Sequence, residues 1–317
     1  MEILSLILPI FAIIVTGFAF VQFKILPESM ADVLIQFAFY VAVPALLFLV
    51  IAQESVERLL NLGFIAAYGG GLVIVFLAVL AGANYWRKRS MGESTMFAMI
   101  STQSNTGFVA LPVLHGTVGE PAVLPVAIAT VIIVAMFLVN LVMVELSQPT
   151  ERQGGRSILA TIGHALLNPL ILSTLLGVAY ALSGWKLPSI ATDYLKILAG
   201  ALTPCALFAV GMTIKLEHLR ISAATILVAS IIKLIALPVF VLILALLFGL
   251  NSVFTVVAVI CAAVPTAKNA YLLAAEYDQS KQLVADTISV TTLVSIVTLI
   301  VWLLALGQFY PEAFRTH

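Results

Sequence analysis

The sequence predicts an all-α membrane protein of ten transmembrane helices, arranged as two inverted five-helix repeats with broken, crossing helices 4 and 9. Three observations carry this prediction: the apolar composition, the spacing of the charged residues, and prolines and glycines that recur in the same order. Apolar residues make up 62% of the 317 positions and charged residues 9%, against about 45–50% and about 25% in soluble proteins. A chain of this composition has too little polar surface for water and is expected to lie in a lipid bilayer.

Charge and cysteine content narrow the class further. The formal net charge is zero and no long basic or acidic run occurs, so no nucleic-acid partner is expected. Cys205 and Cys261 lie in apolar runs and are expected to be small buried hydrophobic residues rather than a disulfide or a metal pair. No cofactor and no metal site are predicted. The N-terminal segment is acidic where a signal peptide is basic, so it is interpreted as a retained first span.

Ten apolar segments are long enough to cross the membrane, which takes roughly 20 helical residues for about 30 Å of hydrocarbon. Charged residues lie in the breaks between these segments, although the break at Gly119 to Pro121 has only Glu120 and the break at Leu250 to Ser252 has none. The predicted spans are residues 2–22, 30–52, 60–85, 94–118, 121–146, 158–182, 189–214, 222–250, 252–275 and 282–307.

Lysine and arginine residues in the loops predict the orientation of the chain. Nine of them lie on the odd-numbered loops and four on the opposite side of the membrane. Because cytoplasmic loops carry the excess of these residues, the odd-numbered loops are expected to be cytoplasmic. Both termini are then outside, on the periplasmic side of an inner cell membrane. Lys233 and Lys268 are not counted, since both fall inside spans.

Prolines and glycines of the first two spans recur in the sixth and seventh spans. The paired positions, each displaced by 160 residues, are Pro9 and Pro169, Gly17 and Gly177, Pro44 and Pro204, and Phe48 and Phe208. Since five spans is an odd number, the second copy enters the membrane from the opposite side, as in the inverted repeats of secondary transporters. The alternative is that prolines are simply frequent in membrane helices. The repeat interpretation predicts repeat one at 1–146, a polar cytoplasmic linker at 147–157 and repeat two at 158–310.

The fourth and ninth spans correspond to each other in this repeat, and both contain residues that break helices. The fourth contains SNTGFVALP and the ninth CAAVPTAKNAY, so that Pro112 and Pro265 are expected to interrupt them near the middle. Backbone N–H and C=O groups without helical partners are tolerated within the membrane only where protein or a water-filled cavity covers them. Such a pair of broken spans indicates a binding site near the membrane midplane, where helix N-termini suit a carboxylate.

Polar residues gather around the two prolines. Asparagines are costly to bury, so they are stronger candidates for the binding site than Ser and Thr. The hydroxyls of Ser and Thr usually donate a hydrogen bond to a carbonyl of their own helix. Asn140 and His115 are candidates for ion coupling, although helix–helix hydrogen bonding and a structural histidine are the simpler explanations. The candidate substrate-binding residues are Gln103, Ser104, Asn105, Thr106, Pro112, Pro265, Thr266, Lys268 and Asn269.

Lys268 is the most informative of these candidates. A lysine at mid-membrane costs about 2.5–3.5 kcal/mol on insertion scales, so its side chain should face a cavity or a partner. It could pair with an anionic substrate, titrate as the coupling group or stand where another transporter binds Na⁺, and the alternative is snorkelling to the surface. Lys233 lies nearer the end of its span, where snorkelling or a structural pair with Glu145 or Asp286 is weighed at least equally with a functional role.

Three further motifs are FAFYVAVPALLFLV in the second span, NPLILSTLLGVAYAL in the sixth and LTPCALFAVGM in the seventh. These motifs resemble sequences of the auxin efflux carrier family, which includes plant PIN-type exporters and bacterial malonate and malate carriers. Asn105 precedes Pro112 with the spacing of the family's N-T-x-x-x-G-x-P pattern, although Ala110 replaces its glycine. Pro265 begins the P-x-A-x-N pattern of bacterial members. The similarity covers nearly the whole chain.

The resemblance implies a ten-span fold with two crossed broken helices and a homodimer. It also implies a scaffold of spans 1, 2, 6 and 7, a mobile transport part made of the other spans, and a role for Asn105 in holding a substrate carboxylate. The short central linker is similar to prokaryotic carriers rather than to plant members with a long cytoplasmic loop. Lys268 departs from the small or apolar residue usual at its position, so coupling to H⁺ or to Na⁺ stays open.

The broken spans, the intramembrane lysine and the resemblance together predict a secondary active transporter of a small organic anion. The anion would be a mono- or dicarboxylate similar to malonate, malate or auxin, moved by elevator-type alternating access. The alternative is a non-transporting receptor or regulatory subunit built on a transporter fold. An enzyme is not expected, because the sequence contains no HExxH, G-x-S-x-G or glycine-rich phosphate-loop motif. The expected partners are the bilayer, the substrate and a second copy of the chain.

Overall fold

The computed structural model describes residues 2–53, 61–87, 90–147, 169–213 and 223–314. Within these ranges the regular structure is helical, and the single extended pairing is an isolated β-bridge. The all-α prediction is therefore confirmed for the described part of the chain. Of the linker predicted at 147–157 only Ser147 is described, and the span predicted at 158–182 is described from Pro169 onward.

Within the described ranges, six helical stretches are long and apolar enough to cross a membrane. Three contain a π-helical turn between two α-helices: α2 (Ser29–Phe37), η1 (Ala38–Ala42) and α3 (Val43–Ile51); α5 (Leu62–Phe64), η2 (Ile65–Gly69) and α6 (Gly70–Arg87); and α14 (Ala223–Ile231), η6 (Ile232–Ala236) and α15 (Leu237–Leu247). The other three are formed by the 3₁₀ turn η4 (Glu120–Ala122) with α9 (Val123–Leu146), by α12 (Ser189–Gly200) with α13 (Leu202–Met212), and by α18 (Lys281–Phe309). All six coincide with predicted spans.

Shorter helices lie where the remaining four spans are predicted. Two are single helices, α1 (Glu2–Gln22) and α11 (Pro169–Ser183). The fourth and ninth spans each consist of two helical pieces separated by a gap. The pieces are α7 (Met91–Thr102) and η3 (Thr106–Ala110) with α8 (Leu111–Thr117) in the fourth, and α16 (Ser252–Ala263) and α17 (Asn269–Glu276) in the ninth.

Three of the described π-helical turns are followed by a proline that does not end the helix. Pro44, Pro112 and Pro238 are the second residues of α3, α8 and α15, which follow η1, η3 and η6. A proline in a regular α-helix clashes with the carbonyl four residues earlier, and the wider π turn shifts the hydrogen bonds so that this clash is relieved. The expectation that Pro112 interrupts its span is therefore wrong. The gap lies earlier, between α7 and η3.

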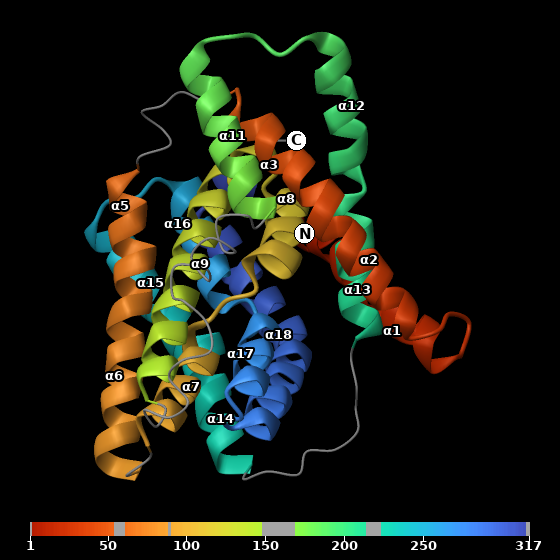
Figure 1. Cartoon of the computed structure of the whole chain (residues 1–317). Helices are drawn as coiled ribbons and strands as arrows, with labels where there is room; N and C mark the ends of the chain where they lie inside the picture. Colours follow the sequence, from red (N-terminus) through yellow and green to blue (C-terminus); the bar gives the residue numbers. More distant parts are fainter. Residues whose placement is uncertain (1, 54–60, 88–89, 148–168, 214–222, 315–317) are drawn as a thin grey trace.

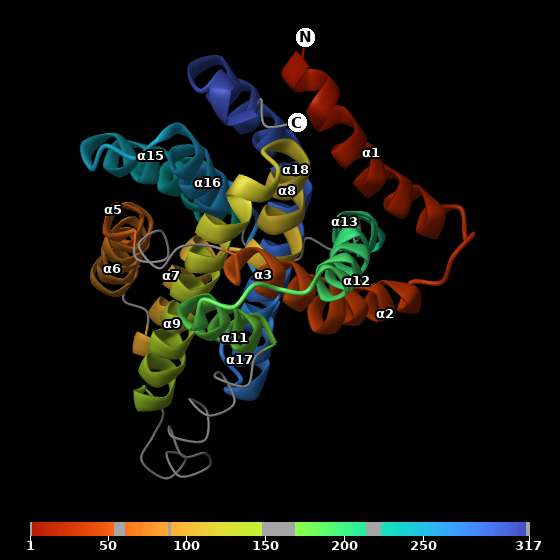
Figure 2. The ribbon, with the colours of Figure 1, turned by 90° about the horizontal axis from the view of Figure 1, so that it is seen from above.

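Helix α1 packs closely against α13, and α11 packs against α3. Two glycines permit the first contact, because a Cβ on Gly17 would lie 2.1 Å from the backbone oxygen of Phe208, and one on Gly211 would lie 1.9 Å from that of Ile14. Figures 1 and 2 show α1, α2, α12 and α13 on one side of the molecule and α5, α6 and α15 on the other. The broken helices lie between these two groups.

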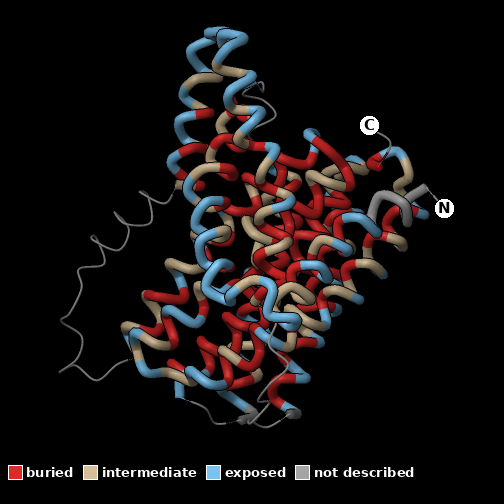
Figure 3. Tube along the Cα trace, turned by 90° about the vertical axis from the view of Figure 1, so that its right-hand side faces the viewer, coloured by how far each residue is buried: buried red, intermediate tan, exposed pale blue. Residues whose placement is uncertain are grey.

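Helices α7 and α16, the first pieces of the two broken helices, are deeply buried. Every residue of α16 from Thr255 to Ala263 is buried, and so is every residue of α7 from Ser94 to Thr102. Figure 3 shows buried residues concentrated through the middle of the molecule. Because these stretches face protein rather than lipid, the non-helical backbone at their ends is shielded from hydrocarbon.

Large apolar side chains cover much of the outer surface. Leu77 is 53% exposed, Leu247 74% and Val297 64%. Contiguous exposed apolar surface is unfavourable in water, and it is what a lipid-facing surface requires. The start of α1 and the end of α18 lie on the same side of the molecule in Figure 2.

Candidate functional site

Two gaps in the helices meet at the centre of the molecule. The first gap, Gln103 to Asn105, separates α7 from η3, and the second, Val264 to Lys268, separates α16 from α17. The residue that begins each gap is extended: φ is −66° and ψ 112° at Gln103, and φ is −64° and ψ 156° at Val264. Both chains therefore leave the helix in a conformation that can pair like a β-strand.

The backbones of the two gaps pair with each other. They form a short antiparallel bridge centred on Ser104 and Thr266. In the absence of water every backbone N–H and C=O needs an internal partner, so each gap supplies partners that the other would otherwise lack. The two hydrogen bonds, with their N···O distances, are Asn105 N–H to the Pro265 carbonyl, 3.0 Å, and Ala267 N–H to the Gln103 carbonyl, 3.1 Å.

Side chains at the crossing add further hydrogen bonds to it. The Thr266 hydroxyl donates to the Ile100 carbonyl in the last turn of α7 at 2.7 Å, and the Thr266 N–H donates to the Thr291 hydroxyl of α18 at 3.3 Å. The Gln103 Nε2 donates to the Ile133 carbonyl of α9 at 3.2 Å. These polar groups hold the crossing in place and tie it to α18 and α9.

Lys233 lies against the crossing and is fully buried. Its Nζ donates to the Ser104 hydroxyl at 3.0 Å and to the Ala262 carbonyl, near the end of α16, at 2.5 Å. The expectation that Lys233 snorkels is therefore wrong, and its amine bonds a hydroxyl and a carbonyl rather than a carboxylate. The available signal was its distance from the nearer end of the predicted span 222–250, which is about three helical turns.

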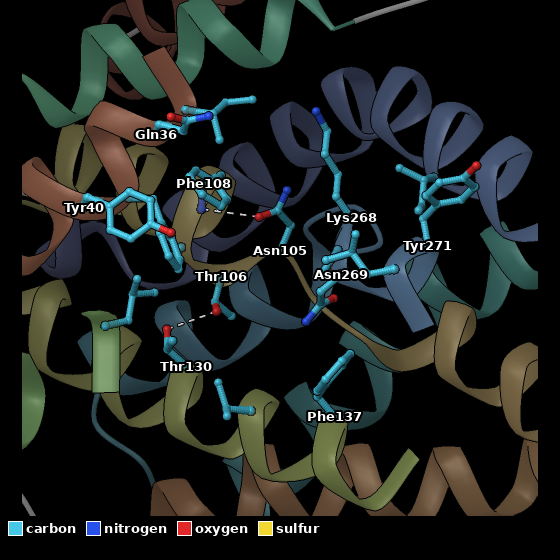
Figure 4. Close-up of a pocket in the computed structure, with 18 of the residues that line it drawn as sticks. Gln36, Tyr40, Asn105, Thr106, Phe108, Thr130, Phe137, Lys268, Asn269 and Tyr271 are labelled. Atoms are coloured by element: carbon cyan, nitrogen blue, oxygen red, sulfur yellow. Dashed lines mark hydrogen bonds between the residues drawn. The ribbon is translucent and has the colours of Figure 1, made fainter. Parts of the chain in front are cut away.

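A cavity of about 900 Å³ lies beside the crossing (Figure 4). One wall comes from α2, η1 and α11, and the other comes from the two gaps with η3, α9, α17 and α18. The lining residues are Ile35, Gln36, Phe39, Tyr40, Asn105, Thr106, Gly107, Phe108, Thr130, Val134, Phe137, Leu138, Leu170, Ala267, Lys268, Asn269, Tyr271, Leu272, Ala285 and Ile288.

Among the described residues that line this cavity, Lys268 alone is charged. It is the residue that precedes α17, and its side chain is exposed. Figure 4 shows the side chain extending away from the amides of Asn105 and Asn269, toward the side of the cavity where Gln36 of α2 lies. Lys268 thus faces a cavity. This agrees with the expectation that a lysine in the membrane faces either a cavity or a partner, because its insertion costs free energy.

Two amides and a pair of hydroxyls supply polar groups beside the lysine. The Asn105 Oδ1 accepts from the Phe108 N–H at 3.3 Å and so caps η3, while the amide nitrogen turns into the cavity (Figure 4). The Thr106 and Thr130 hydroxyl oxygens lie 3.0 Å apart. In the described part of the chain, the Asn269 Oδ1 is buried without a hydrogen-bond partner. Amide N–H groups and a lysine ammonium are the donors that bind carboxylates.

The remaining wall is apolar and aromatic. Phe39 and Phe108 stack with ring centroids 5.7 Å apart, and Tyr40 and Phe137 also line the cavity. These residues are not among those predicted for the site from the sequence, although Phe39 and Tyr40 belong to the FAFYVAVPALLFLV motif of the second span. A search for polar residues in apolar spans cannot find a wall made of apolar side chains, and the contribution of α2 comes from tertiary packing.

The predicted site residues divide into two groups. Asn140 is buried in α9 and donates to the Met136 carbonyl at 2.7 Å, and His115 lies in the last turn of α8; neither lines the cavity. The candidates that line it are Asn105, Thr106, Lys268 and Asn269. The candidates that lie outside the lining are Gln103, Ser104, Pro112, Pro265 and Thr266.

The sequence matches the model of a known family of proteins. Residues 2–303 match the model of a family described as membrane transport protein. The chain belongs to the auxin efflux carrier family. As a member of this family it is a membrane transporter, and it belongs to a group of transporters rather than of enzymes.

Relatives in the auxin efflux carrier family are similar over nearly the whole chain. A Rhizobium meliloti protein named "Putative malonate transporter" is 30% identical over 318 residues, which cover 99% of each chain. An "Uncharacterized transporter" of Methanothermobacter thermautotrophicus is 26% identical over 302 residues, 93% of this chain and 96% of the relative. The Escherichia coli K12 "Uncharacterized transporter YfdV" is 23% identical over 307 residues, 94% and 95% of the two chains.

Proposed function

We propose that this protein is a secondary active transporter that moves a small organic anion by elevator-type alternating access. The observation that carries the proposal is the cavity beside the crossing, whose lining includes Lys268 and the amides of Asn105 and Asn269. A cation and neutral donors without a lining carboxylate suit an anion, and amide pairs suit the two oxygens of a carboxylate. The name of the R. meliloti relative makes malonate a first compound to test.

The ends of two helical pieces strengthen the attraction for an anion. The piece formed by η3 and α8 begins at Thr106, and α17 begins at Asn269; both residues line the cavity. The N-terminus of a helix carries partial positive charge and free N–H groups, which favour a bound carboxylate. The partial positive charge of these two N-termini therefore adds to the charge of Lys268 along the cavity wall.

Two features support the elevator mechanism and the inverted repeat. The cavity lies between α2, η1 and α11 on one side and the crossing with α9, α17 and α18 on the other, so a relative displacement of the two sides would change its access. The contact of α1 with α13 and the contact of α11 with α3 are equivalent under the displacement of 160 residues that relates Gly17 to Gly177. We extend the proposal to ten spans, an inner-membrane homodimer and both termini outside.

Uptake by liposomes that contain the purified protein tests the proposal. Radiolabelled malonate, malate and an aromatic monocarboxylate are offered under imposed H⁺ or Na⁺ gradients. We expect uptake of at least one compound, and a loss of about tenfold or more in Lys268→Ala, the range for a hydrogen bond to a charged group. Lys196→Ala, which removes an exposed lysine of α12 outside the cavity, is the matched control.

Three other results would carry different conclusions. No uptake of any carboxylate under either gradient would overturn the proposal. Equal loss of uptake in Lys268→Ala and Lys196→Ala would show that Lys268 has no specific role in the site. Binding of a carboxylate without flux would identify the alternative, a receptor built on a transporter fold.

A further inference from the structure

A second charged residue lies close to the cavity, on the wall opposite the crossing. Asp32 is in the first turn of α2 and its side chain is exposed. Ile35 and Gln36, three and four positions later, both line the cavity. Residues three and four apart share one face of a helix, so Asp32 lies on the face of α2 that the cavity uses, one turn from the lining residues.

Lys268 and Asp32 approach the cavity from opposite walls. The Lys268 side chain extends from the second gap toward the side of the cavity where Gln36 lies (Figure 4). The Asp32 carboxylate is near enough to act electrostatically on the Lys268 ammonium. Both residues are described by the structure, and no direct ion pair joins them there. The ammonium therefore keeps room for an incoming carboxylate while a fixed negative charge stays nearby.

A substrate with one negative charge and a substrate with two negative charges are expected to bind this site with different affinities. The first carboxylate of a substrate is neutralised by Lys268, the single charged residue of the described lining. A second carboxylate finds no other cation in that lining and is repelled by Asp32. Like unit charges separated by roughly 5–10 Å in a protein environment change a binding constant by about tenfold or more.

The wall beyond the donors is suited to an uncharged group. Phe39, Phe108 and Phe137 line it together with aliphatic side chains. An apolar or aromatic substrate body would bury surface there, whereas a second carboxylate would lose its hydration without gaining a partner.

We infer that Asp32 sets the charge selectivity of the cavity, so that the protein accepts a monocarboxylate with an apolar body and disfavours dicarboxylates. The inference rests on the proposed function, since it assumes that the cavity binds an organic anion. It assigns Asp32 as a specificity-determining residue that acts through charge rather than by direct contact with the first carboxylate.

Equilibrium binding of two matched compounds to the purified protein tests the inference. Malonate and its monomethyl ester have nearly the same size and differ by one negative charge at neutral pH. We expect the wild-type protein to bind the monoester about tenfold more tightly than malonate. Asp32→Asn should bring this ratio close to one, chiefly by tightening malonate, and Asp32→Glu should keep the preference.

Asp193→Asn is the matched control, since it removes an exposed carboxylate of α12 away from the cavity and should leave the ratio unchanged. A preference for malonate in the wild-type protein, or the same ratio in Asp32→Asn, would overturn the role of Asp32 while leaving carboxylate binding intact. Binding of neither compound, nor of phenylacetate, to folded protein would overturn the inference and the proposed function together.

Discussion

Replacement of Thr266 by valine tests how the crossing is held together. The Thr266 hydroxyl donates to the Ile100 carbonyl at 2.7 Å, and the side chain is 1% exposed. In an uninterrupted helix the Ile100 carbonyl would accept from the N–H four residues later, but that N–H belongs to Ser104, inside the first gap. The hydroxyl therefore replaces a missing bond of the helix ladder.

The size of the effect follows from this geometry. Valine keeps the shape of threonine, so no cavity forms, and the loss is confined to one hydrogen bond and one buried carbonyl without a donor. Such a loss costs about 1–3 kcal/mol. Thr287→Val is the matched control: that hydroxyl is also fully buried and donates at 2.7 Å, but its acceptor, the Leu283 carbonyl, lies inside the continuous helix α18. The control should cost under about 1 kcal/mol, because the backbone bond remains.

Thermal unfolding of both variants in detergent compares these costs, and uptake by liposomes reports on function. We expect Thr266→Val to unfold several degrees below the wild-type protein and Thr287→Val to stay close to it. Transport should fall in Thr266→Val, since the gap it destabilises carries Lys268. Equal unfolding temperatures for the two variants would refute the view that the hydroxyl completes the backbone pairing at the crossing.

Two further variants test other contacts. Lys233→Met removes two hydrogen bonds worth about 1.5–3 kcal/mol each and leaves the Ala262 carbonyl buried without that donor. The loss of a buried ammonium offsets part of this cost. We expect a lower unfolding temperature, and an unchanged one would contradict the role of the amine. Gly211→Ala places a Cβ 1.9 Å from the backbone of α1 and should separate α1 from α13, whereas Gly70→Ala meets nothing within 4 Å and is the control. Similar unfolding temperatures for the two alanine variants would refute the close contact.

The positions of the helices could be predicted from the sequence because hydropathy acts over a whole span. The six long helical stretches lie where apolar runs predict them, and the two gaps fall in the predicted fourth and ninth spans. The error at Pro112 has a local cause, since a π-helical turn absorbs the proline without ending the helix. That rearrangement of hydrogen bonds leaves no sign in the hydropathy pattern.

The site could be predicted only in part. Asn105, Thr106, Lys268 and Asn269 line the cavity and were found because polar residues are rare in apolar spans. The wall formed by α2 was missed, because its apolar residues do not differ from lipid-facing residues until the fold places them beside the crossing. The hydrogen-bond partners of Lys233 were also missed, because they are distant from it in the sequence and only the fold brings them together.

The backbone bridge between Ser104 and Thr266 also has a mechanical consequence. Sliding either broken helix along its axis by one residue would move an N–H away from its carbonyl at both hydrogen bonds of the bridge. The polar backbone of both gaps would then be left without partners inside a medium that supplies none. The bridge therefore couples the two broken helices, so that a displacement of Asn105 would also act on Lys268.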